Sequence, residues 1–292
     1  MMQQLSQPQP PVLPPRAVSQ QDVQRMLSFY KNIYPVNSST WVACNASAAE
    51  AALQHPDNAT ALSLAFLASC NLNKQKFTSY DFIGFLSMTW NRPEPQACSQ
   101  LMRFGPDVGV EGGKTLCLDS QGLRRGSRCF VMSVGLNGDT RFEEALHAFA
   151  PACRIIGMDG TLNSAKLNRS LSLPWLHLVP ENFRAATGSS QYAGMRAELL
   201  KIDCEGCEYS ALPPWLDAVC TEQVSVEVHK NFLQRPLQRV MNHHKLFARL
   251  DRTHRLAFIE PNFRWPKIGA EYTWVRRKPC PEVVGAEKVR QY

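Results

Sequence analysis

The chain has 292 residues, a formal net charge of +7, 44% hydrophobic residues and 20% charged residues. This composition allows a packed core and excludes a wholly disordered chain. Basic residues are scattered, and no long basic run is interleaved with aromatic residues, so we expect no nucleic-acid partner. No stretch reaches the roughly 18 apolar residues that span a bilayer, so we expect no transmembrane segment in this chain.

The amino-terminal third divides into two segments. Residues 1–18 are rich in Gln and Pro, and we expect a disordered tail there. These residues also lack the basic start and apolar core of a signal peptide, although a fragment with an anchor upstream would look the same. Residues 19–97 are predicted to form a helical extension, with Ser19 as a candidate cap of its first helix.

Strand and helix signals alternate from residue 98 to residue 280, and residues 281–292 are predicted to be a tail. This alternation predicts an α/β fold with a mostly parallel sheet and helices on both faces. The last two strands have no long helix between them, which suits a terminal hairpin. The predicted strands are residues 128–134, 154–159, 175–179, 198–203, 223–229, 255–260 and 272–276. The predicted helices are residues 141–150, 207–216 and 237–251.

A glycine-rich turn follows the first of these strands. Gly135, Asn137 and Gly138 lie between the strand and a predicted helix that begins near Thr140. Glycine lets the backbone turn tightly and approach a ligand closely, and a helix start offers free N–H groups. By itself such a turn is as often structural as functional.

The second strand ends in an acid, Asp159, about twenty residues after Asn137. A carboxylate at this place can accept hydrogen bonds from a ribose diol. The alternative is that Asp159 caps a turn before Gly160. The matched spacing favours ribose binding.

Three acids crowd the end of the fourth strand: Asp203, Glu205 and Glu208. Clustered carboxylates repel one another unless a cation lies beside them. A metal, a sulfonium or ammonium group, or a basic side chain would each relieve this repulsion. Helix capping explains one acid but not three. Lys201, in the middle of the same strand, is unusual for a buried strand and is expected to be paired or to extend toward solvent.

The segment that holds these acids, K-I-D-C-E-G-C-E-Y-S-A-L, resembles the K-I-D-x-E-G-x-E-x-x-x-L signature of FkbM-type, S-adenosylmethionine-dependent methyltransferases. Upstream, G-G-K-T-L-C-L-D and S-V-G-L-N-G-D-T-R-F-E-E-A-L are similar to the eukaryotic methyltransferase-like branch of that family. The resemblance covers residues 98–278. The K-I-D-x-E-G-x-E segment is its specific part, whereas the glycine turn is common to many proteins.

The resemblance implies a class I, Rossmann-like methyltransferase fold with a seven-stranded sheet that ends in a hairpin. It further implies that the glycine turn lies under the methionine part of the cofactor and that Asp159 holds its ribose. Glu181 would contact the adenine, and Asp203 and Glu205 would lie beside the transferred methyl group. Many members have an acid where this chain has Ser133, so the amino group of the cofactor would lack one partner.

His229 ends the strand predicted at residues 223–229, at the same edge of the sheet. A neutral histidine can take a proton from a hydroxyl as the methyl group moves onto the oxygen. A structural histidine is an equal alternative.

The chain has ten cysteines, and N-x-S/T sequons at Asn37, Asn45, Asn58 and Asn168. Together they favour a Golgi or lumenal setting over the cytosol. Cys204 and Cys207 form a C-x-x-C that lacks a second pair for zinc, so packing of small residues is the favoured interpretation. Cys98 and Cys117 could pair as a disulfide in an oxidising compartment.

These observations predict methyl transfer from S-adenosylmethionine to a hydroxyl or carboxyl group of a glycan or small metabolite. The predicted catalytic residues are Asp203, Glu205 and His229, and the two acids could also bind a divalent metal. One rival is an NAD-type oxidoreductase, which the absence of G-x-G-x-x-G disfavours. The other is a non-catalytic domain of the same fold that acts as an interaction module, for which Ser133 is the best argument.

Overall fold

The computed structural model describes residues 14–19, 21–22, 93–94, 96–119, 123, 129–162, 173–229, 236–262 and 269–281. The extension predicted at residues 19–97 lies almost entirely outside this part, as do the tail at 282–292 and the four sequons. Ser19 does act as a cap: its hydroxyl accepts a hydrogen bond from the backbone N–H of Asp22, and the Asp22 carboxylate accepts one from the N–H of Ser19.

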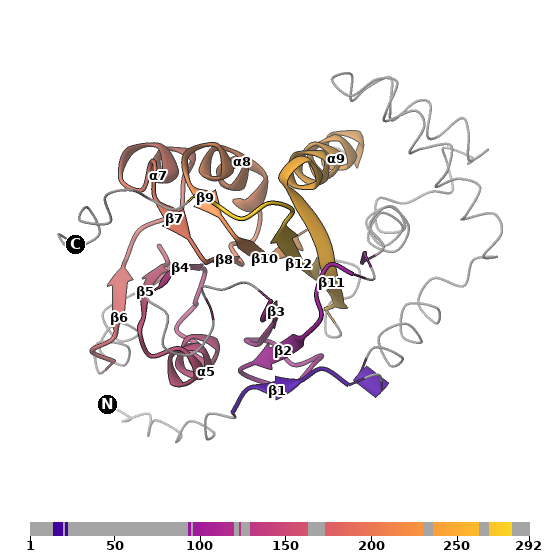
Figure 1. Ribbon diagram of the computed structural model, residues 1–292. Helices are drawn as coiled ribbons and strands as arrows, with labels where there is room; N and C mark the ends of the chain where they lie inside the picture. Colours follow the sequence, from indigo (N-terminus) through magenta and orange to yellow (C-terminus); the bar gives the residue numbers. More distant parts are fainter. Residues whose placement is uncertain are drawn as a thin grey trace, which may run out of the picture.

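The centre of the molecule is a seven-stranded sheet in the order β11-β12-β10-β8-β4-β5-β6 (Figure 1). The five strands from β10 to β6 pair in parallel, whereas β12 is antiparallel to both β10 and β11. This arrangement confirms the class I methyltransferase fold and its terminal hairpin. The strands are β4 (Cys129–Val134), β5 (Cys153–Met158), β6 (Leu176–Val179), β8 (Leu199–Ile202), β10 (Gln223–His229), β11 (His254–Pro261) and β12 (Gly269–Arg276).

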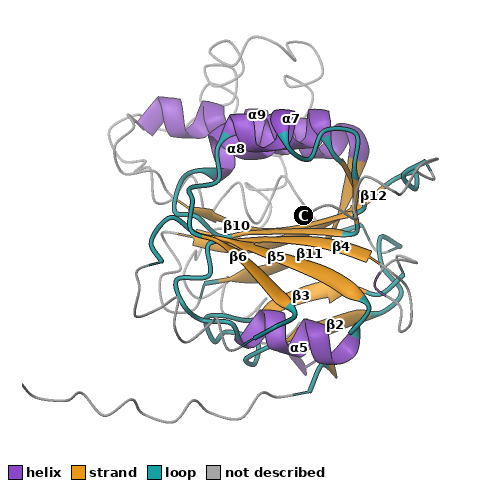
Figure 2. Cartoon of the chain, turned by 90° about the vertical axis from the view of Figure 1, so that its left-hand side faces the viewer, coloured by secondary structure: helices purple, strands orange, loops and turns teal. Residues whose placement is uncertain are grey.

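Helices cover both faces of this sheet, as Figure 2 shows. On one face lie α7 (Ala185–Ser190), α8 (Glu208–Ala218) and α9 (Pro236–Thr253). On the other lie α5 (Arg141–Phe149) and a small three-stranded sheet. The predicted helices at residues 141–150, 207–216 and 237–251 are therefore confirmed, with ends that differ by a residue or two.

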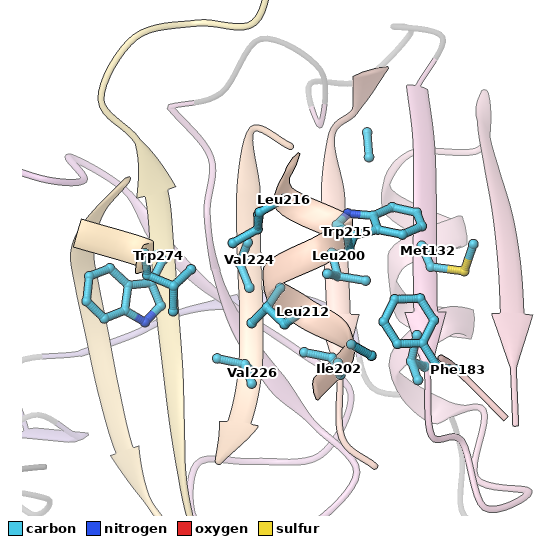
Figure 3. Close-up of a cluster of buried hydrophobic side chains, with 14 of the residues drawn as sticks. Met132, Phe183, Leu200, Ile202, Leu212, Trp215, Leu216, Val224, Val226 and Trp274 are labelled. Carbon is cyan, nitrogen blue, oxygen red and sulfur yellow. The ribbon is translucent and has the colours of Figure 1, made fainter. Parts of the chain in front are cut away.

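Alternating side chains of the strands build one core on each face of the sheet. Met132 of β4 joins Leu200 of β8, Val224 of β10 and Trp215 of α8 in the larger core (Figure 3). Val131, the neighbour of Met132, instead packs in the core beneath α5. Burial on both faces explains why the central strands are apolar runs rather than alternating ones.

The small sheet joins β1 (Arg16–Ala17), β2 (Leu101–Phe104) and β3 (Lys114–Cys117) in antiparallel pairs. Arg16 and Ala17 fall within the tail predicted at residues 1–18, but their backbone pairs with β2, so the expected disorder does not hold for these two residues. Two side chains of the large sheet fasten β3: Gln223 bonds both the N–H and the C=O of Cys117, and the Thr273 hydroxyl donates to the carbonyl of Thr115. A further two-stranded pair joins β7 (Arg196–Ala197) and β9 (Cys220–Thr221).

Disulfides pair all eight cysteines of the described part. The predicted Cys98–Cys117 bond is confirmed. The expectation that Cys204 and Cys207 merely pack was wrong, because they form a disulfide within the turn after β8. The other two bonds are Cys129–Cys153 and Cys220–Cys280. Among the described helices, none has the length and apolar character needed to cross a membrane.

Candidate active site

The glycine turn after β4 and the acidic turn after β8 touch each other. Gly135 has a φ of +76°, and a Cβ added there would lie 1.6 Å from the carbonyl oxygen of Asp203. Only glycine fits this position, since a side chain would collide with the neighbouring backbone. The N–H of Asp203 also donates to the carbonyl of Val134. The two motifs therefore form one continuous edge at the carboxyl ends of adjacent parallel strands, which is where α/β folds bind ligands.

The remainder of the glycine turn is left-handed and is tied to Asp159. Asn137 has a φ of +48° and Gly138 one of +78°. The N–H of Asn137 donates to Asp159 Oδ2, while the N–H and hydroxyl of Thr161 donate to Oδ1, each at 2.7 Å. Burial would raise the pKa of Asp159, but these hydrogen bonds outweigh it and hold the pKa below the usual value. Asp159 is therefore an ionised acceptor beside the turn.

Lys201 is paired, which was one of the two expectations for it, and its partners are backbone carbonyls at the start of the glycine turn. Its ammonium donates to the carbonyl oxygens of Gly135 at 2.7 Å and Val134 at 3.2 Å. Lys201 is 5% exposed. A lysine in the middle of a buried strand thus fixes the backbone of the neighbouring motif.

Ser133 is fully buried and turns away from solvent. Its hydroxyl donates to Oε1 of Glu143 on α5, and burial raises the pKa of Glu143. Glu143 Oε2 has no hydrogen-bond partner among the described residues. Ser133 therefore cannot replace the acid that many members of the resembled family have, because its hydroxyl is both covered and occupied.

A cluster of acids surrounds the ammonium of Lys114, which comes from β3 of the small sheet. Lys114 Nζ lies 3.1 Å from Asp203 Oδ2 and 3.6 Å from Glu227 Oε2, and it contacts Glu271 of β12 still more closely. The Lys114 side chain is 1% exposed. Burial opposes its charge, but the three acids outweigh burial and raise the pKa of Lys114. Of the three acids that crowd the end of β8, Lys114 pairs with Asp203 alone, and its other two partners come from β10 and β12.

His229 completes this cluster. Its Nδ1 lies 3.3 Å from Glu208 Oε1, and its Nε2 lies 3.5 Å from Glu227 Oε1 and 3.7 Å from Asp203 Oδ1. Burial lowers the pKa of His229, but the three acids outweigh it and raise the pKa to about 9. The imidazole is therefore mostly protonated at neutral pH.

The carboxylates and the cations of the cluster nearly balance. Burial and the neighbouring carboxylates raise the pKa of Glu271, although Lys114 opposes them. Burial also acts on Asp203, but Lys114, Lys201 and His229 outweigh it and hold its pKa below the usual value. With Glu271 protonated, the carboxylates of Asp203, Glu208 and Glu227 face three cations, Lys114, Lys201 and His229. Asp203, whose side chain is 26% exposed, presents an ionised carboxylate to a ligand that brings positive charge.

Two of the predicted site residues, Glu205 and Glu181, are exposed and pair with none of the acids or cations of the cluster. Glu205 is exposed, has a φ of +51°, and takes part in none of the ion pairs between described residues. Glu208, and not Glu205, lies beside His229. Of the three acids Asp203, Glu205 and Glu208, the structure therefore brings the first and the third to the site. Glu181 is exposed and follows β6. The backbone N–H of Glu181 and the backbone N–H of Asp159 both donate to the carbonyl of Val179. Glu181 is thus close to the turn that holds Asp159.

Three further residues of the cluster were not predicted as site residues: Lys114, Glu227 and Glu271. Lys114 belongs to the G-G-K-T-L-C-L-D segment that the family resemblance includes, and Glu227 lies two residues before His229. Nothing in the local sequence around Glu271 distinguishes it from an exposed strand residue.

Ligand atoms of Asp203, Glu227 and His229 lie within 4.8 Å of one another, close enough to hold a metal ion. The ammonium of Lys114 already contacts two of these residues. Because a divalent cation beside an ammonium is repelled, the arrangement suits a metal poorly.

Comparison with known proteins agrees with this fold. A family model described as a methyltransferase domain matches residues 182–276, which include Asp203 and His229 but neither the glycine turn nor Lys114. A search of curated proteins gives no match.

Solved structures with a similar fold include two fibrillarins and a SAM-dependent methyltransferase. Fibrillarin from Aeropyrum pernix, with natively bound S-adenosyl-L-methionine, is 9% identical, with a TM-score of 0.38 over 54% of this chain and 70% of that one. The Methanococcus jannaschii fibrillarin pre-rRNA processing protein is 6% identical, with a TM-score of 0.41 over 55% and 71%. A SAM-dependent methyltransferase from Aquifex aeolicus is 11% identical, with a TM-score of 0.34 over 53% and 85%.

Proposed function

We propose that the chain is a methyltransferase that moves the methyl group of S-adenosylmethionine onto an oxygen nucleophile. The observation that supports this most is the contact between Gly135 and the backbone of Asp203, because it places a cofactor-type turn against a charged site. The matched methyltransferase domain supports the same reaction. The FkbM-type relationship is part of this proposal and rests on the K-I-D-C-E-G-C-E segment.

The residues fit the cofactor in two ways. The left-handed backbone at Gly135, Asn137 and Gly138 forms a close turn for the methionine portion, and the ionised Asp159 beside it can accept from the ribose. The ionised carboxylate of Asp203 favours the positive sulfonium. When bound, the cofactor supplies the electrophilic methyl group.

The protein's own part in the reaction is alignment and proton removal. The carboxylates of Asp203 and Glu208 lie beside Nε2 and Nδ1 of His229, respectively, and orient the imidazole. His229 releases its proton more readily once a second cation lies beside it, because like charges lower the pKa of an imidazole. In its neutral form His229 accepts the proton of a hydroxyl acceptor. Glu205 is proposed to contact the acceptor from its exposed position, and Glu181 the adenine.

Two features favour an acceptor in the secretory lumen, such as a glycan hydroxyl, over one in the cytosol. Four disulfides pair every cysteine of the described part, and disulfides persist in oxidising compartments. The sequons would carry glycans in the same setting. Location in the Golgi and glycosylation are tested by expression in a eukaryotic cell: a mass loss on glycosidase treatment supports them, and an unmodified cytosolic protein contradicts them.

Calorimetric titration tests the cofactor. We expect binding of S-adenosylmethionine and none of NAD. Binding of NAD alone would point to an oxidoreductase, and absence of heat with S-adenosylmethionine up to millimolar concentration would leave the fold as an interaction module, as Ser133 would suggest. Screening hydroxylated glycans and metabolites with labelled cofactor then identifies the acceptor.

A further inference from the structure

In sequence, the Cys204–Cys207 disulfide lies between Asp203 and Glu208, the two acids whose carboxylates lie beside opposite nitrogens of His229. It closes a loop of four residues in the turn from β8 to α8. Asp203 directly precedes this loop, and its Oδ1 lies 3.7 Å from Nε2 of His229. Glu208 directly follows it, and its Oε1 lies 3.3 Å from Nδ1 of the same imidazole. The cross-link therefore fixes the distance between two residues that contact opposite nitrogens of one histidine.

The turn inside the cross-link has an unfavourable backbone. Glu205 has a φ of +51° and Gly206 one of +119°. A left-handed conformation is unfavourable for Glu205, which has a side chain, so an open loop would leave this conformation more readily. The closed loop brings the N–H of Gly206 to Glu208 Oε2 at 2.8 Å, while the N–H of His229 donates to Oε1 at 2.7 Å. Glu208 is fully buried by these contacts.

The other disulfides have different surroundings. Cys129–Cys153 joins the first residues of β4 and β5, at the opposite edge of the sheet. Cys220–Cys280 joins β9 to the segment after β12. Neither is next to a residue of the Lys114 cluster. The third, Cys98–Cys117, includes the last residue of β3, the strand that begins with Lys114, but it does not join two residues that contact His229. Both cysteines of Cys204–Cys207 are half-buried.

We infer that the Cys204–Cys207 disulfide is a positioning element that holds Asp203 and Glu208 on His229, so that methyl transfer requires its oxidised form. This inference rests on the proposed function. Reduction by a dithiol breaks the S–S bond: two electrons and two protons give two thiols, while the dithiol closes into its own disulfide. The freed loop relaxes at Glu205 and Gly206, and Glu208 loses its fixed place beside the imidazole.

Two double variants of the full chain test this inference: Cys204→Ser with Cys207→Ser, and as a matched control Cys220→Ser with Cys280→Ser. The titration of His229 is followed by NMR of histidine-labelled protein and assigned with His229→Gln. We expect the first variant to lower the midpoint of His229 by one pH unit or more. The limiting kcat, reached at pH values where His229 is neutral in both proteins, should fall at least tenfold, with KM for the cofactor within threefold. The control should lower Tm but leave both kcat and the midpoint unchanged.

The NMR readout keeps the two proposals distinguishable, because it needs no activity. If wild type binds no S-adenosylmethionine, the proposed function fails while the positioning role is still measured. An unchanged His229 midpoint and kcat in the first variant, or equal changes in both variants, would overturn the inference. If the first variant does not fold, wild type is treated with dithiothreitol, and mass spectrometry identifies the reduced pair before the same titration.

Discussion

The ammonium of Lys114 lies 3.1 Å from Asp203 Oδ2, so a strand of the small upstream sheet supplies the cation that the acidic edge of the large sheet needs. The two residues are 89 positions apart in sequence. Hydrogen bonds from Gln223 and Thr273 to β3 keep the small sheet in place. The small sheet therefore contributes a side chain to the candidate site.

Replacement of Lys114 by Met should destabilise the protein by about 3–5 kcal/mol, because it leaves the buried Glu227 and the partly buried Asp203 and Glu271 without their cation. Urea unfolding measures this, with the exposed Lys278→Met as control. The difference from wild type should shrink at low pH, where the acids are neutral. A variant as stable as wild type at pH 7 would show that the ammonium is not what balances the acids.

Chelation should leave methyl transfer unchanged. The ammonium of Lys114 lies within 3.6 Å of both Asp203 and Glu227, and a divalent ion held by these acids would have to displace it. The measurement is turnover after dialysis against EDTA, with and without added Mg²⁺ or Mn²⁺. Loss of activity that the metal restores would mean that Asp203 binds an ion in the working enzyme.

The activity should rise with pH because His229 must be neutral to accept a proton. Its pKa in the free protein is raised to about 9, so kcat/KM, which reports the free enzyme, should increase up to about pH 9. The midpoint of kcat should lie lower, because the bound cofactor adds positive charge. His229→Gln should remove both slopes, whereas the exposed His177→Gln should keep them. A pH-independent kcat/KM in wild type would exclude His229 as the base.

The same histidine gives stability the opposite pH dependence. A pKa raised from 6.5 to about 9 on folding means that the folded protein binds the proton more tightly than the unfolded chain. The resulting stabilisation, about 3 kcal/mol, is fully present below pH 6.5 and is lost as the pH rises through 9. Urea unfolding at pH 6 and pH 9 should show this loss in wild type and a smaller one in His229→Gln.

The strands could be predicted closely because their signals are local. The strand predicted at residues 223–229 has the observed bounds, and an apolar run that ends in acid or glycine marked β4, β5 and β8. The cluster around Lys114 could not be predicted in the same way. It joins residues up to 157 positions apart, and their approach depends on how the small sheet packs on β10 and β12.

The turn after β8 shows that contacts set by local backbone geometry do not follow from residue spacing alone. The acids Asp203, Glu205 and Glu208 indicated a cation site. Because Glu205 has a left-handed backbone, its side chain is exposed, whereas the side chain of Glu208 lies beside His229. The same turn brings Cys204 and Cys207 within bonding distance, although their spacing alone suggested packing. Backbone conformation at one residue decided both outcomes.

Asp159→Ala should weaken binding of S-adenosylmethionine by about 10- to 100-fold, since a hydrogen bond to a charged group contributes about 1.5–3 kcal/mol. The variant also removes the acceptor that holds the N–H of Asn137 in the glycine turn. Calorimetry measures the affinity, and Asp217→Ala, which removes an exposed acid of α8, is the control. An affinity equal to that of wild type would remove Asp159 from the ribose site.

Removal of the Cys220–Cys280 disulfide should cost about 4 kcal/mol of stability by the chain-entropy relation, because the bond closes a long loop. Its two cysteines are 60 positions apart and tie the segment after β12 to β9. Thermal unfolding of the double serine variant measures the cost. Cys98→Ser with Cys117→Ser, which opens a loop of only 19 positions, should cost less. Equal losses in the two variants would mean that strain or packing, and not loop length, sets the contribution of these bonds.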